Sequence, residues 1–199
     1  MQRCSGWTTV GGLILGLVSS GLAAEPKVFS PEDIIQWERH SFEGETSYER
    51  VEVDGRQAVH AQCTEATASG LTLPQDVDLT ETPIIEWEWR VDDTLSGIDE
   101  TTKAGDDYPA RIYAVDEHTI LRWRTRALNY VWSSDQPAGA DWPNAYASQA
   151  HMIAVRSGAP EAAGEWRTER RHLRDDFQRY HNRELDKING LAIMTDCDD

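Results

Sequence analysis

Two carboxylates and a guanidinium stand close together near the middle of the chain, and they are the residues best suited to chemistry. Asp106 and Asp107 lie between a glycine and a proline, which indicates a turn. Arg111 and Tyr113 follow in a run of β-branched and aromatic residues that favours a strand. Because side chains alternate along a strand, Arg111 and Tyr113 share one face. Such a cluster could bind a polar ligand or supply an acid and a cation to a reaction.

A second strand-like run, residues 127–132, adds an amide and two aromatic rings that could stack on a sugar and bind its hydroxyls. The candidate ligand-binding residues are therefore Asp106, Asp107, Arg111, Tyr113, Asn129, Tyr130 and Trp132. Structural alternatives stand beside this hypothesis. Asp107 and Arg111 could form an internal ion pair that ties the turn down. Tyr130 and Trp132, two residues apart on one face, could be core, and for Trp132 core is the favoured interpretation.

An enzyme that acts on polysaccharide, a hydrolase or lyase, is the alternative to a binding protein. It would use the Asp106/Asp107/Arg111 cluster, with a base drawn from the histidines at positions 118, 151 and 172. No spacing ties a histidine to those aspartates, and the sequence has no nucleophile elbow, phosphate-binding loop or zinc motif. The sequence thus favours binding of a glycan or another envelope ligand over catalysis, and it assigns no catalytic residue.

Calcium is a third possibility, as the ion of a stabilised interaction domain. Asp196 and Asp198, which follow an apolar run near the end of the chain, offer the hard oxygen ligands that calcium prefers. Asp106 and Asp107 offer the same chemistry in their own turn. Neither run has the glycine and distal glutamate of the twelve-residue calcium loop, so a solvated acidic turn is the alternative. No other cofactor is predicted.

The first 24 residues have the order of a secretory signal peptide. Arg3 precedes an uncharged, mostly apolar segment, residues 12–22, and small residues follow as far as Ala24. The apolar segment is shorter than the roughly 20 residues that a spanning helix needs. We therefore expect cleavage near Ala24, a periplasmic or secreted mature chain from residue 25, and no membrane insertion after cleavage.

The mature chain is strongly acidic. The full chain has a net charge of −16, from 19 basic and 35 acidic residues, so loss of Arg3 leaves 18 against 35, or −17. Such a surface repels nucleic acid and anionic membranes at moderate salt, and no nucleic-acid partner is expected. An acidic solvated surface, suited to a salty habitat, is the simplest interpretation. The sequence does not determine the oligomeric state.

Two cysteines remain after the leader, Cys63 and Cys197. In an exported protein they could form a disulfide, which would restrict the unfolded chain by about 4–5 kcal/mol in the chain-entropy model. Two separate buried thiols are the alternative. Zinc is disfavoured, because neither cysteine has a second cysteine or a histidine at ligand spacing.

The remaining pattern is that of many short strands and almost no long helix. Asp54-Gly55 between alternating runs predicts a hairpin. In the strand predicted over residues 83–91, Trp87 and Trp89 share a face that we expect to be core, and Glu86 and Glu88 face the other way. We predict one all-β domain over residues 25–199, an antiparallel β-sandwich of jelly-roll type with few short helices.

Four segments together resemble a bacterial exported family known as domain of unknown function 3047. They are residues 85–91 (IEWEWRV), 104–113 (AGDDYPARIY), 128–132 (LNYVW) and 192–198 (AIMTDCD). The resemblance covers most of the chain from about Val28 and implies export and a single β-rich domain, with no catalytic residues to transfer. The family pattern continues into a further strand, whereas this chain stops at Asp199, which leaves a truncation open. Cys197 stands where the family pattern favours a small polar residue such as Thr, so a family-wide disulfide is not implied.

Overall fold

The structure, a computed structural model, describes residues 25–63, 66–118, 120–160 and 164–198. The predicted signal peptide, residues 1–24, lies outside the described residues, as does Asp199. Among the described helices, none has the length and apolar character needed to cross a membrane.

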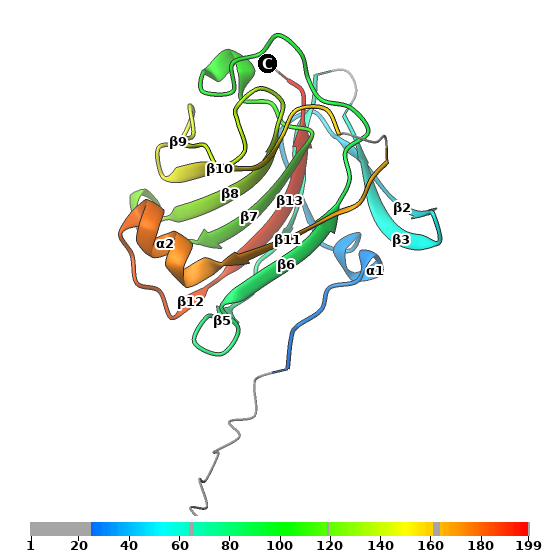
Figure 1. Ribbon diagram of the computed structural model, residues 1–199. Coiled ribbons are helices and arrows are strands. Elements are labelled where there is room, and N and C mark those ends of the chain that lie inside the picture. Colours follow the sequence, from blue (N-terminus) through cyan, green and yellow to red (C-terminus); the bar gives the residue numbers. More distant parts are fainter. Residues whose placement is uncertain (1–24, 64–65, 119, 161–163, 199) are drawn as a thin grey trace, which may run out of the picture.

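A seven-stranded sheet forms the centre of the molecule (Figure 1). In spatial order its strands are β1 (Glu38–Glu43), β4 (Ala68–Leu73), β13 (Gly190–Asp196), β7 (Ala110–Asp116), β8 (Arg126–Ser133), β10 (Ala150–Ser157) and β9 (Asp141–Pro143). Every neighbouring pair is antiparallel except β8 and β10, which run parallel. The last strand of the chain, β13, thus lies between β4 and β7.

Three two-stranded ribbons and short helices complete the described fold. The ribbons pair β6 (Ile84–Trp89) with β11 (Arg167–His172), β5 (Val77–Asp78) with β12 (Lys187–Ile188), and β2 (Ser47–Val53) with β3 (Arg56–Gln62). The helices are α1 (Pro31–Ile34), α2 (Leu173–His181) and two 3-10 turns, η1 (Lys103–Gly105) and η2 (Arg122–Arg124). The β6–β11 ribbon and α2 lie in front of the large sheet, and the β2–β3 hairpin projects to one side (Figure 1).

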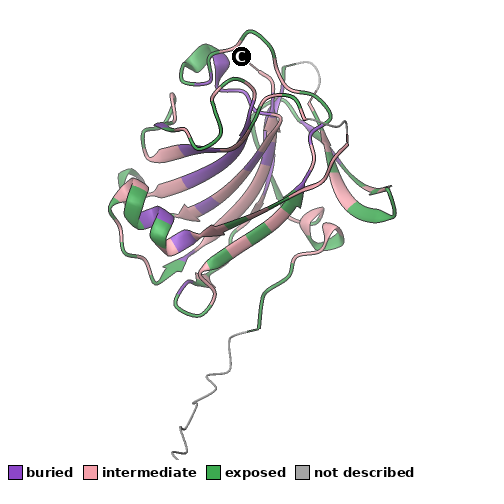
Figure 2. Cartoon of the chain, viewed as in Figure 1, coloured by how far each residue is buried: buried purple, intermediate pink, exposed green. Residues whose placement is uncertain are grey.

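Strand β6 shows why the ribbon packs on the sheet. Its even-numbered residues are exposed and its odd-numbered residues are progressively buried, an alternation visible as bands in Figure 2. Trp87 lies 5.4 Å from the ring of Tyr130, and Trp89 lies 5.7 Å from that of Trp132. The predicted tryptophan stripe is therefore core, and Glu88 on the other face pairs with Arg56 at 3.0 Å.

Helix α2 is one of the few short helices in this all-β domain, and it is partly buried. It begins after His172, whose side chain accepts a hydrogen bond from the Asp175 backbone, and ends at Asn182 in the left-handed conformation. Leu173 and Phe177, one turn apart, are 2% and 0% exposed and pack into the main core. These two side chains, together with Tyr180, pack the helix on the sheet.

The all-β class with few short helices is confirmed. The relative direction of two neighbouring strands, β8 and β10, is a feature that hydrophobic periodicity cannot reveal. Residues 134–149 return the chain to the starting end of β8 and contain β9, which pairs antiparallel with β10. As a result β10 adds to β8 in parallel, and the large sheet is mixed. Alternation fixes which side chains share a face but not the direction of the neighbouring strand.

The two faces of the large sheet have different surroundings. One, which we call the covered face, packs against β6–β11 and α2 and carries Leu128, Tyr130 and Trp132. The opposite face carries Arg111 and Tyr113, and where β8 and β10 pass it is covered by Tyr108 and Trp142 packed on Val131, Met152 and Ala154. The candidate residues must therefore be assigned to one face or the other.

Candidate functional site

A buried ion pair joins β7 to the end of β13. Arg111 lies in register with Met194, which brings its guanidinium to Asp196, two residues further along β13. The Arg111 Nε donates to Asp196 Oδ1 at 3.0 Å, and its Nη2 donates to Asp196 Oδ2. Arg111 and Asp196 are 5% and 3% exposed. Because this ion pair is bidentate and buried, it holds both side chains in one orientation.

The turn before β7 wraps around the same guanidinium. Arg111 Nη2 donates to the Asp106 backbone carbonyl, and Nη1 lies 3.8 Å from the Asp106 carboxylate. The Asp106 carboxylate also accepts from Asn144 Nδ2 at 2.6 Å and from the Tyr108 hydroxyl at 3.2 Å. The Arg111 guanidinium lies 4.3 Å from the centre of the Tyr108 ring, a cation–π contact. Asp106 is therefore an organised, buried acceptor.

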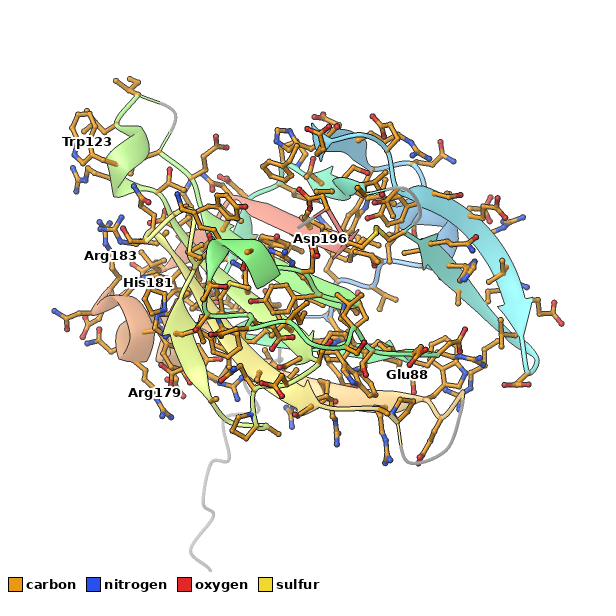
Figure 3. All side chains as sticks on the ribbon, turned by 90° about the horizontal axis from the view of Figure 1, so that it is seen from above. Glu88, Trp123, Arg179, His181, Arg183 and Asp196 are labelled. Carbon is orange, nitrogen blue, oxygen red and sulfur yellow. A yellow bond between two sulfur atoms is a disulfide. The ribbon has the colours of Figure 1, made fainter. Side chains whose placement is uncertain are left out.

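Asp107 turns the other way, toward the end of the chain. Its Oδ1 accepts a hydrogen bond from the Asp198 backbone N–H at 3.0 Å. One carboxylate oxygen from each of Asp107, Asp196 and Asp198 lies within 4.8 Å of the others. We call these three residues the three-carboxylate cluster; Asp196 lies in the interior in Figure 3. The two acidic runs, which the sequence offers as separate calcium candidates, thus meet at one place.

Tyr113 and Asn129 extend the site along the opposite face. The Tyr113 hydroxyl accepts from Arg111 Nη1 at 3.3 Å and lies 3.3 Å from Met194 Sδ. Burial raises the pKa of the Tyr113 phenol, against an opposing effect of Arg111, so the phenol is protonated at neutral pH. Asn129, in register with Tyr113, is 1% exposed, and its buried Oδ1 has no hydrogen-bond partner among the described residues.

Tyr130 and Trp132 lie on the covered face, at 0% and 2% exposure. The Tyr130 hydroxyl donates to Asp176 on α2 at 2.7 Å, and Trp132 Nε1 donates to the Gly158 carbonyl at 2.9 Å. These two rings anchor α2 and the strand ends inside the core. The structure therefore brings five of the seven candidate residues to one side of the sheet and places these two on the other.

Two of the three candidate bases, His151 and His172, have side-chain partners elsewhere. His151 Nε2 lies 2.8 Å from Asp141 Oδ1, and its ring stacks on Tyr180. His172 caps α2, and the His118 backbone donates to Thr125 Oγ1 at 3.0 Å. None of these contacts joins a histidine to the aspartates around Arg111.

Glu100 is a residue of this region that the sequence does not single out. It is 0% exposed, and its carboxylate accepts hydrogen bonds from Ser133 Oγ, from the Ser134 N–H at 2.6 Å and from the Gln136 N–H at 3.3 Å. Its carbonyl accepts from Tyr108 and Trp142. Glu100 thus holds the segment before the Asp106 turn against the end of β8. The sequence gives no signal for this role, because Glu100 lies in a polar stretch with the composition of an ordinary loop.

A disulfide fixes the chain between two members of the cluster. Cys63, which follows β3, bonds to Cys197, with Cα atoms 6.1 Å apart. The Cys197 backbone also donates to the Thr67 carbonyl at 3.0 Å. Because Cys197 separates Asp196 from Asp198, the bond restrains both carboxylates.

The Asp107→Ala substitution is expected to lower the free energy of unfolding by about 1–3 kcal/mol, since it removes a buried acceptor. Asp107 is 3% exposed and accepts the Asp198 N–H. Glu86→Ala is the control: that carboxylate is 63% exposed and lies 3.9 Å from Arg170, so the loss should stay below about 0.5 kcal/mol. Urea midpoints of the two variants decide the comparison, and equal, negligible losses would contradict it.

Comparison with known proteins identifies a family for this chain but no activity. No curated protein matches the chain in sequence. The model of one family matches residues 35–199, which include the Asp106 turn, Arg111, the three-carboxylate cluster and both disulfide cysteines. That family is described as "Protein of unknown function (DUF3047)". Because the match covers most of the chain and the whole of this site, the chain belongs to the DUF3047 family.

Proposed function

We propose that this protein is an exported, non-catalytic binding domain of the cell envelope, and that its three-carboxylate cluster holds a calcium ion. The observation that carries the proposal is the convergence of Asp107, Asp196 and Asp198 oxygens within 4.8 Å. Calcium binds oxygen at about 2.3–2.6 Å, so oxygens on opposite sides of the ion are up to about 5 Å apart. The spacing of the three carboxylates is compatible with one ion between them.

Charge supports a cation at this place. Arg111 carries one positive charge, whereas Asp106, Asp107, Asp196 and Asp198 can carry four negative charges. Three of these carboxylates are buried, where like charges repel more strongly than in water. Carboxylate oxygens of Asp107, Asp196 and Asp198 would be the protein ligands. Water and backbone carbonyls would complete the coordination.

The position of the cluster supports a structural role for the ion. An ion held by Asp107 and Asp198 would tie the turn before β7 to the chain after β13, next to the Cys63–Cys197 disulfide. The disulfide is also what export to an oxidising compartment allows. His151 and His172 bind partners away from the acids around Arg111, which favours binding over polysaccharide cleavage.

A glycan is the second candidate ligand, and one exposed ring favours it. Tyr146 is 57% exposed, and its hydroxyl donates to the Lys103 carbonyl at 3.0 Å. Its backbone donates to Asn144, whose amide in turn binds Asp106. An aromatic ring at the surface next to a charged and polar loop can bind a sugar while the buried residues hold the loop in place.

Calcium is expected to raise the melting temperature of the chain from Glu25 onward, and EDTA to lower it. Binding to the native state alone stabilises by about 3 kcal/mol when free calcium is about 100-fold above Kd. Asp198→Asn removes one ligand charge but keeps the backbone N–H that bonds Asp107, so most of the calcium response should disappear. Differential scanning calorimetry with and without calcium measures both effects.

Asp186→Asn is the matched control, because this carboxylate is 82% exposed and pairs with Arg174 away from the cluster. It should leave the calcium response unchanged. A melting temperature that is identical in calcium and EDTA would refute the calcium site. In the same assay, a shift with one soluble polysaccharide that Tyr146→Ala abolishes would support the glycan, and release of reducing ends would contradict a non-catalytic role.

A further inference from the structure

The connection from β7 to β8 ends in a tip that exposes two large apolar side chains. Ile120 is 86% exposed and Trp123, in η2, is 65% exposed. Trp123 lies at the far edge of the molecule in Figure 3. Two such side chains three residues apart on one tip are more than the scattered single apolar residues of an ordinary surface.

Arginines surround this tip. Arg124 is exposed, and Arg126 Nη1 donates to the Trp123 and Thr125 carbonyls at 2.9 and 2.7 Å. Arg183, which follows α2, lies 3.8 Å from Asp116, which is itself in register with Arg126. We call Arg124, Arg126 and Arg183 the basic rim; Figure 3 shows Arg183 on the same side of the molecule as Trp123.

Two acidic neighbours, Asp116 and Glu117, offset part of the positive charge of this rim. Asp116 is half-buried between Arg126 and Arg183, and Glu117 is exposed at the start of the connection. Burial lowers the pKa of His181, although the contact of its ring with the Ala127 carbonyl opposes this effect. The three arginines of the basic rim outnumber these two acidic residues, so this tip of an acidic protein is locally positive.

We propose that this tip anchors the protein at the surface of an anionic lipid bilayer. Tryptophan prefers the boundary between headgroups and acyl chains, and an isoleucine beside it would enter the acyl region. The basic rim would lie at the level of the lipid phosphates, with which guanidinium groups form paired hydrogen bonds.

The overall negative charge does not prevent this contact. The sequence predicts repulsion from anionic membranes because it averages charge over the whole surface. At physiological salt the screening length is about 8 Å, so an approaching bilayer responds mainly to the charges at the tip that touches it. The rest of the acidic surface would orient the molecule with the tip toward the lipid.

The exposed aliphatic side chain of Ile120 favours a bilayer over an acidic polysaccharide as the ligand of this tip. A Trp123 ring could stack on a sugar, with arginines on its carboxylates. Ile120 has no such use on a sugar, although it is the more exposed of the two. A lipid surface accounts for both side chains and for the basic rim.

Co-sedimentation with vesicles tests the proposal on the chain from Glu25 onward, so that the apolar segment 12–22 contributes nothing. Binding to vesicles of equal parts phosphatidylcholine and phosphatidylglycerol should exceed binding to pure phosphatidylcholine and should weaken as salt rises. Trp123→Ala should weaken binding about tenfold or more. Arg124→Gln should weaken it about fivefold.

Two controls match these variants. Phe42→Ala removes a side chain that is 67% exposed on β1, and Arg170→Gln removes an arginine that is 68% exposed on β11. Both should bind vesicles as the parent does. Failure of the parent to bind anionic vesicles, or equal losses in the controls, would overturn the proposal. Binding to polygalacturonate but not to vesicles, with the same dependence on Trp123, would assign the tip to an acidic polysaccharide instead.

Discussion

Loss of the Cys63–Cys197 disulfide is expected to lower the free energy of unfolding by about 5 kcal/mol. The two cysteines are 134 residues apart in the sequence. A cross-link over so long a loop removes many conformations from the unfolded chain, and this dominates its stabilising effect in the chain-entropy model. Urea unfolding of the oxidised protein and of a Cys63→Ser/Cys197→Ser variant, compared by midpoint and slope, measures the loss.

The control for this experiment is the reductant itself. Dithiothreitol should lower the midpoint of the parent and leave that of the double variant unchanged. The calcium response of the variant should also weaken, because Cys197 separates Asp196 from Asp198 and its bond restrains both. Equal midpoints for parent and variant would show that the hydrogen bond from Cys197 to Thr67 and the β13 pairing already hold this end of the chain.

Local patterns predicted the elements whose signals lie within a few residues. The Asp54-Gly55 pair forms the predicted β2–β3 turn, with φ of 54° and 75° at the two residues. Alternation predicted β6 and the burial of its tryptophans. These features depend on adjacent residues, which the sequence shows directly.

Alternation does not say which face of a strand meets a ligand. Along β8, Tyr130 and Trp132 share one face and Asn129 the other, and the structure buries all three. A strand that is covered on both sides carries no polar face to reveal its orientation. For this reason the sequence could group these residues as one ligand set although they lie on opposite sides of the sheet.

Contacts between residues far apart in the sequence are the second feature that local patterns did not predict. Local spacing suggested that Arg111 pairs with Asp107, four residues away. In the structure the guanidinium binds Asp196, 85 residues away, and contacts the neighbouring Asp106. Only the placement of β13 beside β7 creates that contact. The same pairing joins the two acidic runs, so the three-carboxylate cluster could not be found from spacing.

Arg111→Met is expected to lower the free energy of unfolding by about 3–5 kcal/mol, because it leaves buried carboxylates without their guanidinium. Arg111 is 5% exposed and binds both oxygens of Asp196 and the Asp106 carbonyl. Methionine fills a similar volume, so the loss reports charge and hydrogen bonds more than a cavity. Arg170→Met is the control: its 3.9 Å pair with Glu86 is exposed and should contribute less than about 0.5 kcal/mol.

A double variant separates the two sources of this loss. Arg111→Met with Asp196→Leu removes the unpaired charge together with the guanidinium, and it should be more stable than Arg111→Met alone. Recovery should be incomplete, because Asp196 also accepts the Tyr108 backbone N–H at 3.0 Å, which leucine leaves unsatisfied. A double variant no more stable than the single one would mean that the hydrogen bonds of Arg111 to Asp106 and Tyr113, rather than the buried charge on Asp196, determine the effect.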